Sequence, residues 1–179
     1  DEFLTVLERI EARGKPAFGA LSRKLYGDVD EAVVADGPQL RMVGDQLLAG
    51  LGQLDPQLKD ERDEKTLSAP AAVDRLRSRM NQWLQPEHHD VHVQISDGIH
   101  SDAAAGGDTI KLKADSRFSE REVRLLETHE GWVHVATSLN GKSQSTCRFL
   151  SIGPPSSTVT QEGLAVLVET PSLDSYPAR

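Results

Sequence analysis

The sequence has a single cysteine, Cys147, among its 179 residues. An intramolecular disulfide is therefore excluded, and the scarcity of cysteine fits a reducing compartment such as the cytoplasm. The 20 lysines and arginines are outnumbered by 28 aspartates and glutamates, which gives a formal net charge of −8. Because nucleic acids are bound by basic surfaces, this balance argues against nucleic acid as a partner.

Long apolar runs are also missing. No stretch approaches the roughly 18 consecutive apolar residues that a membrane-spanning helix needs. The first residues, Asp1 and Glu2, are acidic where a secretory signal peptide would be basic. These features predict a cytoplasmic protein with no membrane partner. The chain also lacks an initiator methionine, so we expect it to be a piece of a longer protein.

The composition is that of a globular domain, with 37% hydrophobic and 27% charged residues. We predict one domain over residues 1–179, with a helical portion at 1–86 and the remainder at 87–179. Apolar residues at helical spacing predict amphipathic helices at about 3–13, 16–26, 38–51 and 70–84. In the last of these, we expect the following residues to face inward: Val73, Leu76, Met80, Trp83 and Leu84.

After Pro86 the apolar period changes from 3.6 residues to 2. Alternating apolar residues predict a half-buried strand over 91–95, and a second strand is expected over 109–113, after the Gly106-Gly107 turn. Four histidines near the first strand offer a competing metal cluster: His88, His89, His92 and His100. These histidines lack a third partner on a helix, and strand alternation turns His92 to the polar face. We therefore expect these histidines to be exposed.

The stretch at residues 127–134 reads Glu-Thr-His-Glu-Gly-Trp-Val-His. A His-Glu pair followed by a second histidine is typical of helix-borne zinc peptidase sites, in which two imidazoles bind the ion and the glutamate acts on its water. The usual histidines are four residues apart. Here His129 and His134 are five apart, roughly 140° around a regular α-helix. We therefore predict a π-bulge between Glu130 and His134, which Gly131 makes easier.

The start of this helix has its own signature. Ser119 and Glu122 form a capping box, and Phe118 and Val123 occupy the positions of a hydrophobic staple. The helix is therefore predicted to begin at about Glu120. An ordinary core helix with two partly buried histidines is the alternative interpretation of this segment.

A catalytic zinc site takes three protein ligands and leaves a position for water. Glu162 is the candidate third ligand. Thr158 and Gln161 match a second capping box, which predicts a helix that begins there and carries Glu162 in its first turn. In this helix we expect four apolar residues to pack inward: Leu164, Ala165, Leu167 and Val168.

Four motifs follow one another at characteristic separations. They are His-Glu-Gly-Trp-Val-His at 129–134, Leu-Asn-Gly at 139–141, Gly-Pro-Pro at 153–155 and Gln-Glu-Gly-Leu-Ala at 161–165. Together, over about residues 21–169, they resemble the QEGLA-motif family. Its bacterial members are labelled flavohaemoglobin expression-modulating proteins. Its animal members are the microtubule-associated tyrosine carboxypeptidases, zinc enzymes that remove the C-terminal tyrosine of α-tubulin.

The resemblance implies an α+β fold, a mostly helical zincin-like metallopeptidase domain with a small sheet beside the metal helix. Carried over residue by residue, it makes His129, His134 and Glu162 the ligands of one Zn²⁺ per chain, and Glu130 the general base. Family members continue well beyond the second motif helix, so we expect a C-terminal part to be missing from this chain.

The predicted function is that of a zinc-dependent carboxypeptidase acting on a peptide or protein C-terminal tail, with tyrosine or another aromatic residue implied by the resemblance. Such an enzyme needs a cation for the terminal carboxylate. The candidates are Lys111, Lys113, Lys142 and Arg148. The strand at 109–113 is expected to be the edge strand with which an extended substrate pairs.

Two alternatives remain open. One is an endopeptidase or aminopeptidase that uses the same metal site. The other is a non-proteolytic metal-binding regulator of flavohaemoglobin expression. Glu130 beside His129 favours an enzyme, because a structural zinc site needs no adjacent base.

Overall fold

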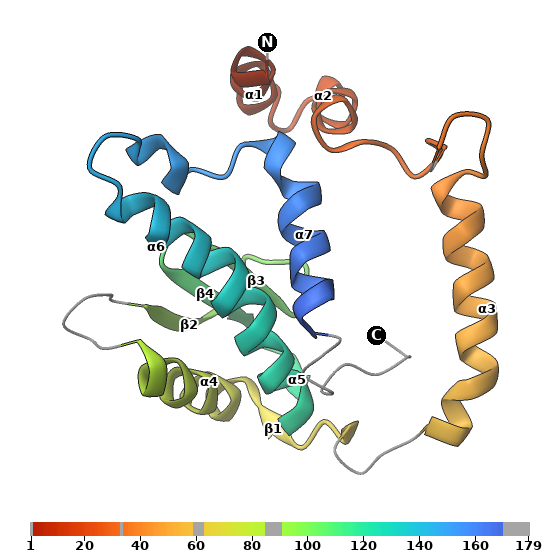
Figure 1. Ribbon diagram of the computed structural model, residues 1–179. Coiled ribbons are helices and arrows are strands. Elements are labelled where there is room, and N and C mark those ends of the chain that lie inside the picture. Colours follow the sequence, from red (N-terminus) through yellow and green to blue (C-terminus); the bar gives the residue numbers. More distant parts are fainter. Residues whose placement is uncertain (1, 33, 59–62, 85–90, 170–179) are drawn as a thin grey trace. The chain divides into compact units, whose positions relative to one another are not determined.

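A computed structural model of the chain describes residues 2–32, 34–58, 63–84 and 91–169 (Figure 1). Contacts divide the chain into two units, the first built from residues 1–58 and 154–159 and the second from residues 59–153 and 160–177. The single domain over 1–179 stays a prediction. Every candidate site residue lies in the second unit.

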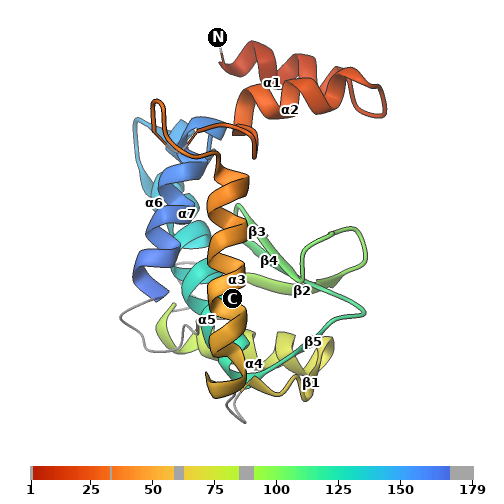
Figure 2. The ribbon, with the colours of Figure 1, turned by 90° about the vertical axis from the view of Figure 1, so that its right-hand side faces the viewer.

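Three helices of the first unit match the predicted ones: α1 (Glu2–Glu11), α2 (Ala17–Tyr26) and α3 (Leu40–Leu58). The helices α1 and α2 pack together (Figure 2). The Arg9 guanidinium on α1 donates a hydrogen bond to Ser22 Oγ on α2 at 2.8 Å. Gly27 ends α2 with φ of 84°, a left-handed conformation in which glycine carries no steric penalty.

The second unit is built on α4 (Ala69–Trp83) and a three-stranded sheet of β2 (His92–Ser96), β3 (Ala103–Gly106) and β4 (Thr109–Lys113). The strand order is β2-β4-β3; β2 pairs with β4 in parallel and β3 pairs with β4 antiparallel. A separate two-stranded pairing joins β1 (Leu67–Ser68) to β5 (Arg117–Phe118). The predicted small sheet and the predicted α+β class are therefore confirmed.

Two details of this region differ from the prediction. The strand β4 is the central strand and not the edge, because β2 pairs with one side of it and β3 with the other. The sequence analysis does not predict β3, since Ala-Ala-Ala-Gly has low strand propensity. Trp83 is 68% exposed and does not face inward. It is the last residue of α4, and Leu84, just beyond the helix, packs against the core instead.

The helical segment that carries His129 and His134 is called the metal helix below, after its predicted role. It has three parts, α5 (Glu120–Leu126), η2 (Glu127–Val135) and α6 (Ala136–Ser143) (Figure 1). The predicted capping box at its start is confirmed, because Ser119 Oγ accepts from the Glu122 N–H and the Glu122 carboxylate accepts from the Ser119 N–H. The segment packs with α4 and the sheet around a core of buried side chains: Leu76, Met80, Val93, Ile110, Leu112, Phe118, Val123, Leu126, Val135 and Leu139.

The last helix, α7 (Pro155–Glu169), follows the short 3₁₀ helix η3 (Arg148–Ser151) and lies beside the metal helix (Figures 1 and 2). The predicted capping box at Thr158 is wrong. The helix begins a turn earlier, because Pro155 has the backbone angle that suits a first helical position. Glu162 is therefore about two turns into α7.

The predicted inward face of α7 is also wrong in part. Ala165 is fully buried, but Leu164, Leu167 and Val168 are exposed by 45%, 66% and 40%. The reason is that α7 turns polar side chains toward the metal helix, which places these apolar residues on its outer side.

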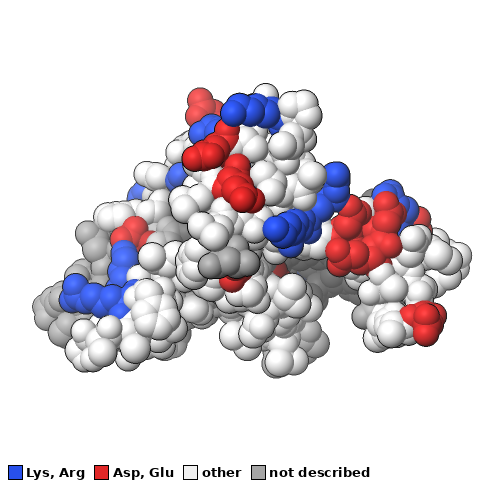
Figure 3. All heavy atoms as spheres, turned by 90° about the horizontal axis from the view of Figure 1, so that it is seen from above, with Lys and Arg blue, Asp and Glu red and all other residues white. Residues whose placement is uncertain are grey.

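Among the helices of the described residues, none combines the length and the hydropathy that crossing a bilayer requires. On the face seen in Figure 3, lysine and arginine side chains lie next to acidic ones and are not gathered into a single patch. His92 and His100 are exposed, and His88 and His89 lie outside the described residues.

Candidate metal centre

The helical segment changes its hydrogen-bonding pattern where the two histidines lie. Residues Glu127–Val135 form a π-helix, in which a backbone N–H bonds to the carbonyl five residues earlier. Residues five apart then share a face, and the rings of His129 and His134 lie 5.0 Å apart between centroids. The predicted widening between Glu130 and His134 is confirmed, and it extends over nine residues.

Close packing fixes the position of η2 on the core. A Cβ added at Gly131 would lie 2.6 Å from Met80 Sδ on α4 and 3.9 Å from Ile110 Cδ1 on β4. Met80 and Ile110 are both fully buried, so neither has free space in which to move aside. Glycine at this position therefore allows η2 to approach both α4 and the sheet. Val133 and Val135 are also buried, at 2% and 0% exposure.

The structure brings Glu162 of α7 to the two histidines. Its carboxylate oxygens lie 3.3 Å from His129 Nε2 and 3.5 Å from His134 Nε2. One ligand atom from each of the three residues lies within 4.8 Å of the other two. Two atoms bound to a tetrahedral zinc at about 2.0–2.1 Å are about 3.4 Å apart. The two nitrogen–oxygen separations, 3.3 Å and 3.5 Å, match this spacing.

The outer nitrogens of the two rings have acceptors of their own. His129 Nδ1 lies 2.8 Å from Glu169 Oε1, and His134 Nδ1 lies 3.1 Å from Gln161 Oε1. Because a carboxylate or amide oxygen can only accept, each Nδ1 carries the proton in these bonds. In a neutral ring the Nε2 lone pair is then free and faces Glu162. Two such lone pairs and a carboxylate that face one point can be shared by one cation between them.

Two carboxylates of η2 are buried, and they have different surroundings. Glu127 is 6% exposed and pairs with the guanidinium of Arg79 on α4. Glu130, 9% exposed, directly follows His129. The ion pair with Arg79 distinguishes Glu127 from Glu130, which is the predicted general base.

The four candidate carboxylate-binding cations lie in different environments. Lys142 Nζ is 2.7 Å from Asp108 Oδ2, and this hydrogen bond, together with one from Thr109, holds the pKa of the Asp108 carboxyl below its usual value. Lys113 lies 3.6 Å from Asp115. Lys111 stays without a carboxylate partner within the described residues.

Strand alternation separates two of these cations from the metal helix. Ile110 and Leu112 of β4 are fully buried on the face where α4 and η2 pack. Lys111 and Lys113 alternate with them and so lie on the opposite face of the sheet. Arg148, on η3, is exposed, and it has no ion pair among the described residues.

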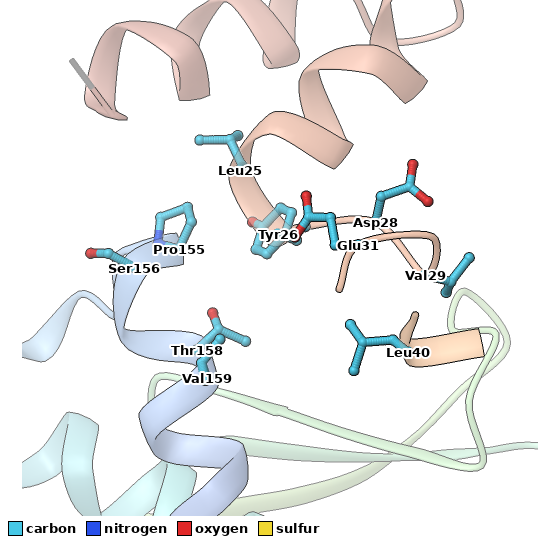
Figure 4. Close-up of a pocket in the computed structure, with 11 residues that line it drawn as sticks. Leu25, Tyr26, Asp28, Val29, Glu31, Leu40, Pro155, Ser156, Thr158 and Val159 are labelled. Atoms are coloured by element: carbon cyan, nitrogen blue, oxygen red, sulfur yellow. The ribbon is translucent and has the colours of Figure 1, made fainter. Parts of the chain in front are cut away.

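A pocket of about 500 Å³ lies elsewhere, in the first unit, between the end of α2, the loop that follows it, and the beginnings of α3 and α7 (Figure 4). Apolar side chains such as Leu25, Leu40 and Val159 line it, with the carboxylate of Glu31 beside them. None of the predicted site residues is among those lining it, so the metal centre and this pocket are separate features.

Sequence reasoning missed the roles of two residues. Gln161 was interpreted as part of a helix cap, and Glu169 was not singled out. The available signal was the helical spacing of Gln161, Ala165 and Glu169, four residues apart on one side of α7. The contacting face of this helix is polar, so a pattern of apolar residues does not reveal it.

Comparison with protein families gives one match. The whole chain, residues 1–179, matches the family described as microtubule-associated tyrosine carboxypeptidase. Comparisons with curated proteins and with solved structures found no match. The family match confirms the resemblance carried by the two histidines and the motif at 161–165. The chain belongs to the microtubule-associated tyrosine carboxypeptidase family.

Proposed function

We propose that this chain is a zinc-dependent carboxypeptidase domain that removes the C-terminal residue, tyrosine or another aromatic, from a peptide or protein tail. The observation that carries the proposal is the convergence of His129, His134 and Glu162, with both Nε2 atoms facing the Glu162 carboxylate, in a chain of this family. The π-helix supports it, since such helices are often found at functional sites.

The three residues fit one zinc ion in ligand type and separation. Two imidazoles and one carboxylate are a common set for catalytic zinc, and Glu162 is 52% exposed, so the site is open on its side. A zinc ion bound there would polarise the scissile carbonyl and lower the pKa of a bound water molecule from its bulk value toward about 7.

Glu130 is proposed as the general base. A buried carboxylate next to a ligand histidine would accept the proton of the attacking water and pass it to the leaving amine. An amide at the same position would have the same shape and could not take the proton. The salt bridge of Glu127 with Arg79 leaves that carboxylate outside this chemistry.

The strand β3 is proposed as the docking edge for substrate, in place of the predicted β4. It is one of the two outer strands of the sheet, it contacts η2, and within the described residues its strand pairing uses only one of its two sides. An extended peptide would add to the other side through backbone hydrogen bonds. The side chains of Ala103, Ala104 and Ala105 on this strand are small. On this basis we propose a zincin-like arrangement of strand, substrate and helix.

Arg148 is the proposed partner of the terminal carboxylate among the four candidates. A guanidinium fork matches a carboxylate better than an ammonium does. Lys142 and Lys113 are paired with aspartates, and Lys111 and Lys113 lie on the sheet face away from η2. Arg148 is exposed and has no acidic partner within the described residues.

Mass spectrometry of peptides incubated with the zinc-loaded chain tests the proposal. We expect loss of single C-terminal residues, fastest from peptides that end in tyrosine, and no reaction of C-terminally amidated versions. The matched control is His134→Ala, which should be inactive. Internal cuts would indicate an endopeptidase, loss of N-terminal residues would indicate an aminopeptidase, and unchanged peptides would favour a non-proteolytic regulator; each of these results would contradict the proposal.

A further inference from the structure

Two side chains of α7 contact the candidate ligands from behind. Glu169 Oε1 lies 2.8 Å from His129 Nδ1, and Gln161 Oε1 lies 3.1 Å from His134 Nδ1. The later residue of α7 bonds to the earlier histidine, so the two helices run antiparallel here. Glu162 is between them in sequence. A single helix thus provides one candidate ligand and an acceptor for each of the other two.

We propose that Glu169 and Gln161 are positioning residues, which hold His129 and His134 with their Nε2 atoms turned toward the metal position. The proposal rests on the proposed zinc site and goes beyond it, because neither residue belongs to the ligand set. Either nitrogen of a neutral imidazole can carry the proton, and the ring can take more than one orientation about its Cβ–Cγ bond. An acceptor at Nδ1 selects one tautomer and one ring orientation before any metal arrives.

Glu169 provides the stronger of the two contacts. Its side chain is 6% exposed, and the bond to His129 is short. A buried carboxylate is costly to keep unless it is hydrogen-bonded to a good donor, so this residue is placed for its contact and not for packing. A charged acceptor also makes the imidazole a better electron donor at Nε2, as carboxylates behind metal-bound histidines do.

Gln161 provides the weaker contact. Its amide oxygen is neutral, the separation from His134 is longer, and the residue is only half buried. Hydrogen bonds to charged acceptors are roughly twice as strong as those between neutral groups. The two histidines are therefore held unequally, and loss of Glu169 should affect zinc binding more than loss of Gln161.

Zinc affinity measured by competition with a chromophoric chelator tests the inference. Three variants are compared with the wild-type chain: Glu169→Gln, which keeps an acceptor, Glu169→Leu, which removes it, and Gln161→Leu. Loss of a group behind a metal ligand weakens metal binding by about 10- to 100-fold. We expect a loss in this range for Glu169→Leu, a smaller loss for Gln161→Leu, and partial rescue in Glu169→Gln.

The matched control is Glu127→Gln. Glu127 is a buried carboxylate two residues from His129, but its partner is Arg79. If Glu169 acts only by stabilising the fold, both Glu127→Gln and Glu169→Leu should lower the unfolding midpoint and weaken zinc binding together. If Glu169 positions His129, the two variants should differ even when their unfolding midpoints are equally lowered. Glu169→Leu should then bind zinc more weakly, and Glu127→Gln should bind zinc with wild-type affinity.

A measurement on the zinc-free chain tests the positioning role independently of zinc binding. Nitrogen-15 NMR of the histidine side chains should show the Nδ1–H tautomer for neutral His129 in the wild-type chain and loss of that preference in Glu169→Leu. Zinc bound equally tightly by wild type and Glu169→Leu, with an unchanged tautomer, would overturn the positioning role alone. A wild-type chain that binds no zinc would overturn the proposed function, and the positioning role with it.

Discussion

The two helices that provide the candidate ligands are held in place by different forces. The π-helix η2 is fixed by apolar packing: Val133 and Val135 are buried, and Gly131 lies against Met80. The helix α7 reverses this pattern along residues 160–169. Its buried side carries Ala165 and Glu169, and its larger apolar side chains, such as Val166 and Leu167, are exposed.

This difference indicates how the site is assembled. The core holds the two histidines in place whether or not metal is bound, because apolar burial does not depend on the ion. Glu162 lies on α7, which contacts η2 through hydrogen bonds and ion pairs of His129 and His134. A shared metal ion would therefore stabilise the position of α7 more than that of η2.

The largest effect is expected on kcat, from a change of the proposed general base on η2, Glu130. Glu130→Gln should lower kcat by about 10²–10⁴-fold, the usual contribution of a general base. Zinc content should stay at the wild-type level, because Glu130 acts on water and not on the ion. Elemental analysis beside peptide turnover measures both quantities. Full activity in Glu130→Gln would contradict the proposed mechanism, and loss of its zinc would show that Glu130 is a ligand.

Metal removal should sharpen the contrast between the helices. A ligand present at 100 times its Kd stabilises a fold by about 2.7 kcal/mol, and we expect this stabilisation to be concentrated in α7. After chelation, the backbone amides of residues 161–169 should exchange hydrogen faster, while those of residues 131–135 keep their protection. Hydrogen exchange with mass spectrometry measures this. Equal loss of protection in both segments would contradict the comparison.

A matched pair of glycines tests packing at each helix. Gly131→Ala in η2 places a methyl group against Met80, and such overpacking costs about 1–3 kcal/mol of unfolding free energy. The methyl group of Gly163→Ala in α7 would meet nothing within 4 Å in the described structure. Because alanine stabilises a helix by about 0.5–1 kcal/mol relative to glycine, this change should raise the unfolding free energy. Denaturant unfolding should show opposite signs. Equal destabilisation by both changes would be inconsistent with the packing described.

The smallest effect is expected from an apolar residue on the outer side of α7. Val166 is 59% exposed, and Val166→Ala should change the unfolding free energy by less than about 0.5 kcal/mol. Val135 in η2 is fully buried, and Val135→Ala should cost about 1.5 kcal/mol or more, from two buried carbon groups at about 0.8 kcal/mol each. Similar losses in the two variants would show that α7 is packed as η2 is.

Local signals predicted the metal helix well. The capping box of Ser119 and Glu122 fixed its start, and the five-residue separation of His129 and His134 required the π-helical turn that the structure contains. Both predictions depend on neighbouring residues and on the geometry of one helix. Tertiary contacts did not need to be known.

The rest depended on long-range contacts that no local pattern encodes. The alanines of β3 form a strand only because β4 offers a partner, so the order of the sheet was not predictable from periodicity. In α7, the residues that face inward include those that form hydrogen bonds with the imidazoles of η2, a helix distant in the sequence. Gln161 therefore bonds to His134 and does not cap its own helix, and Leu164 and Leu167 are exposed.

The central claim is that His129, His134 and Glu162 bind one zinc ion together. Zinc content per chain, measured by elemental analysis for the wild type and for Glu162→Ala, tests it most directly. We predict one zinc per wild-type chain and loss of zinc in Glu162→Ala, because two histidines alone are too few ligands to hold the ion. A wild-type chain without zinc, or full zinc occupancy in Glu162→Ala, would contradict the claim.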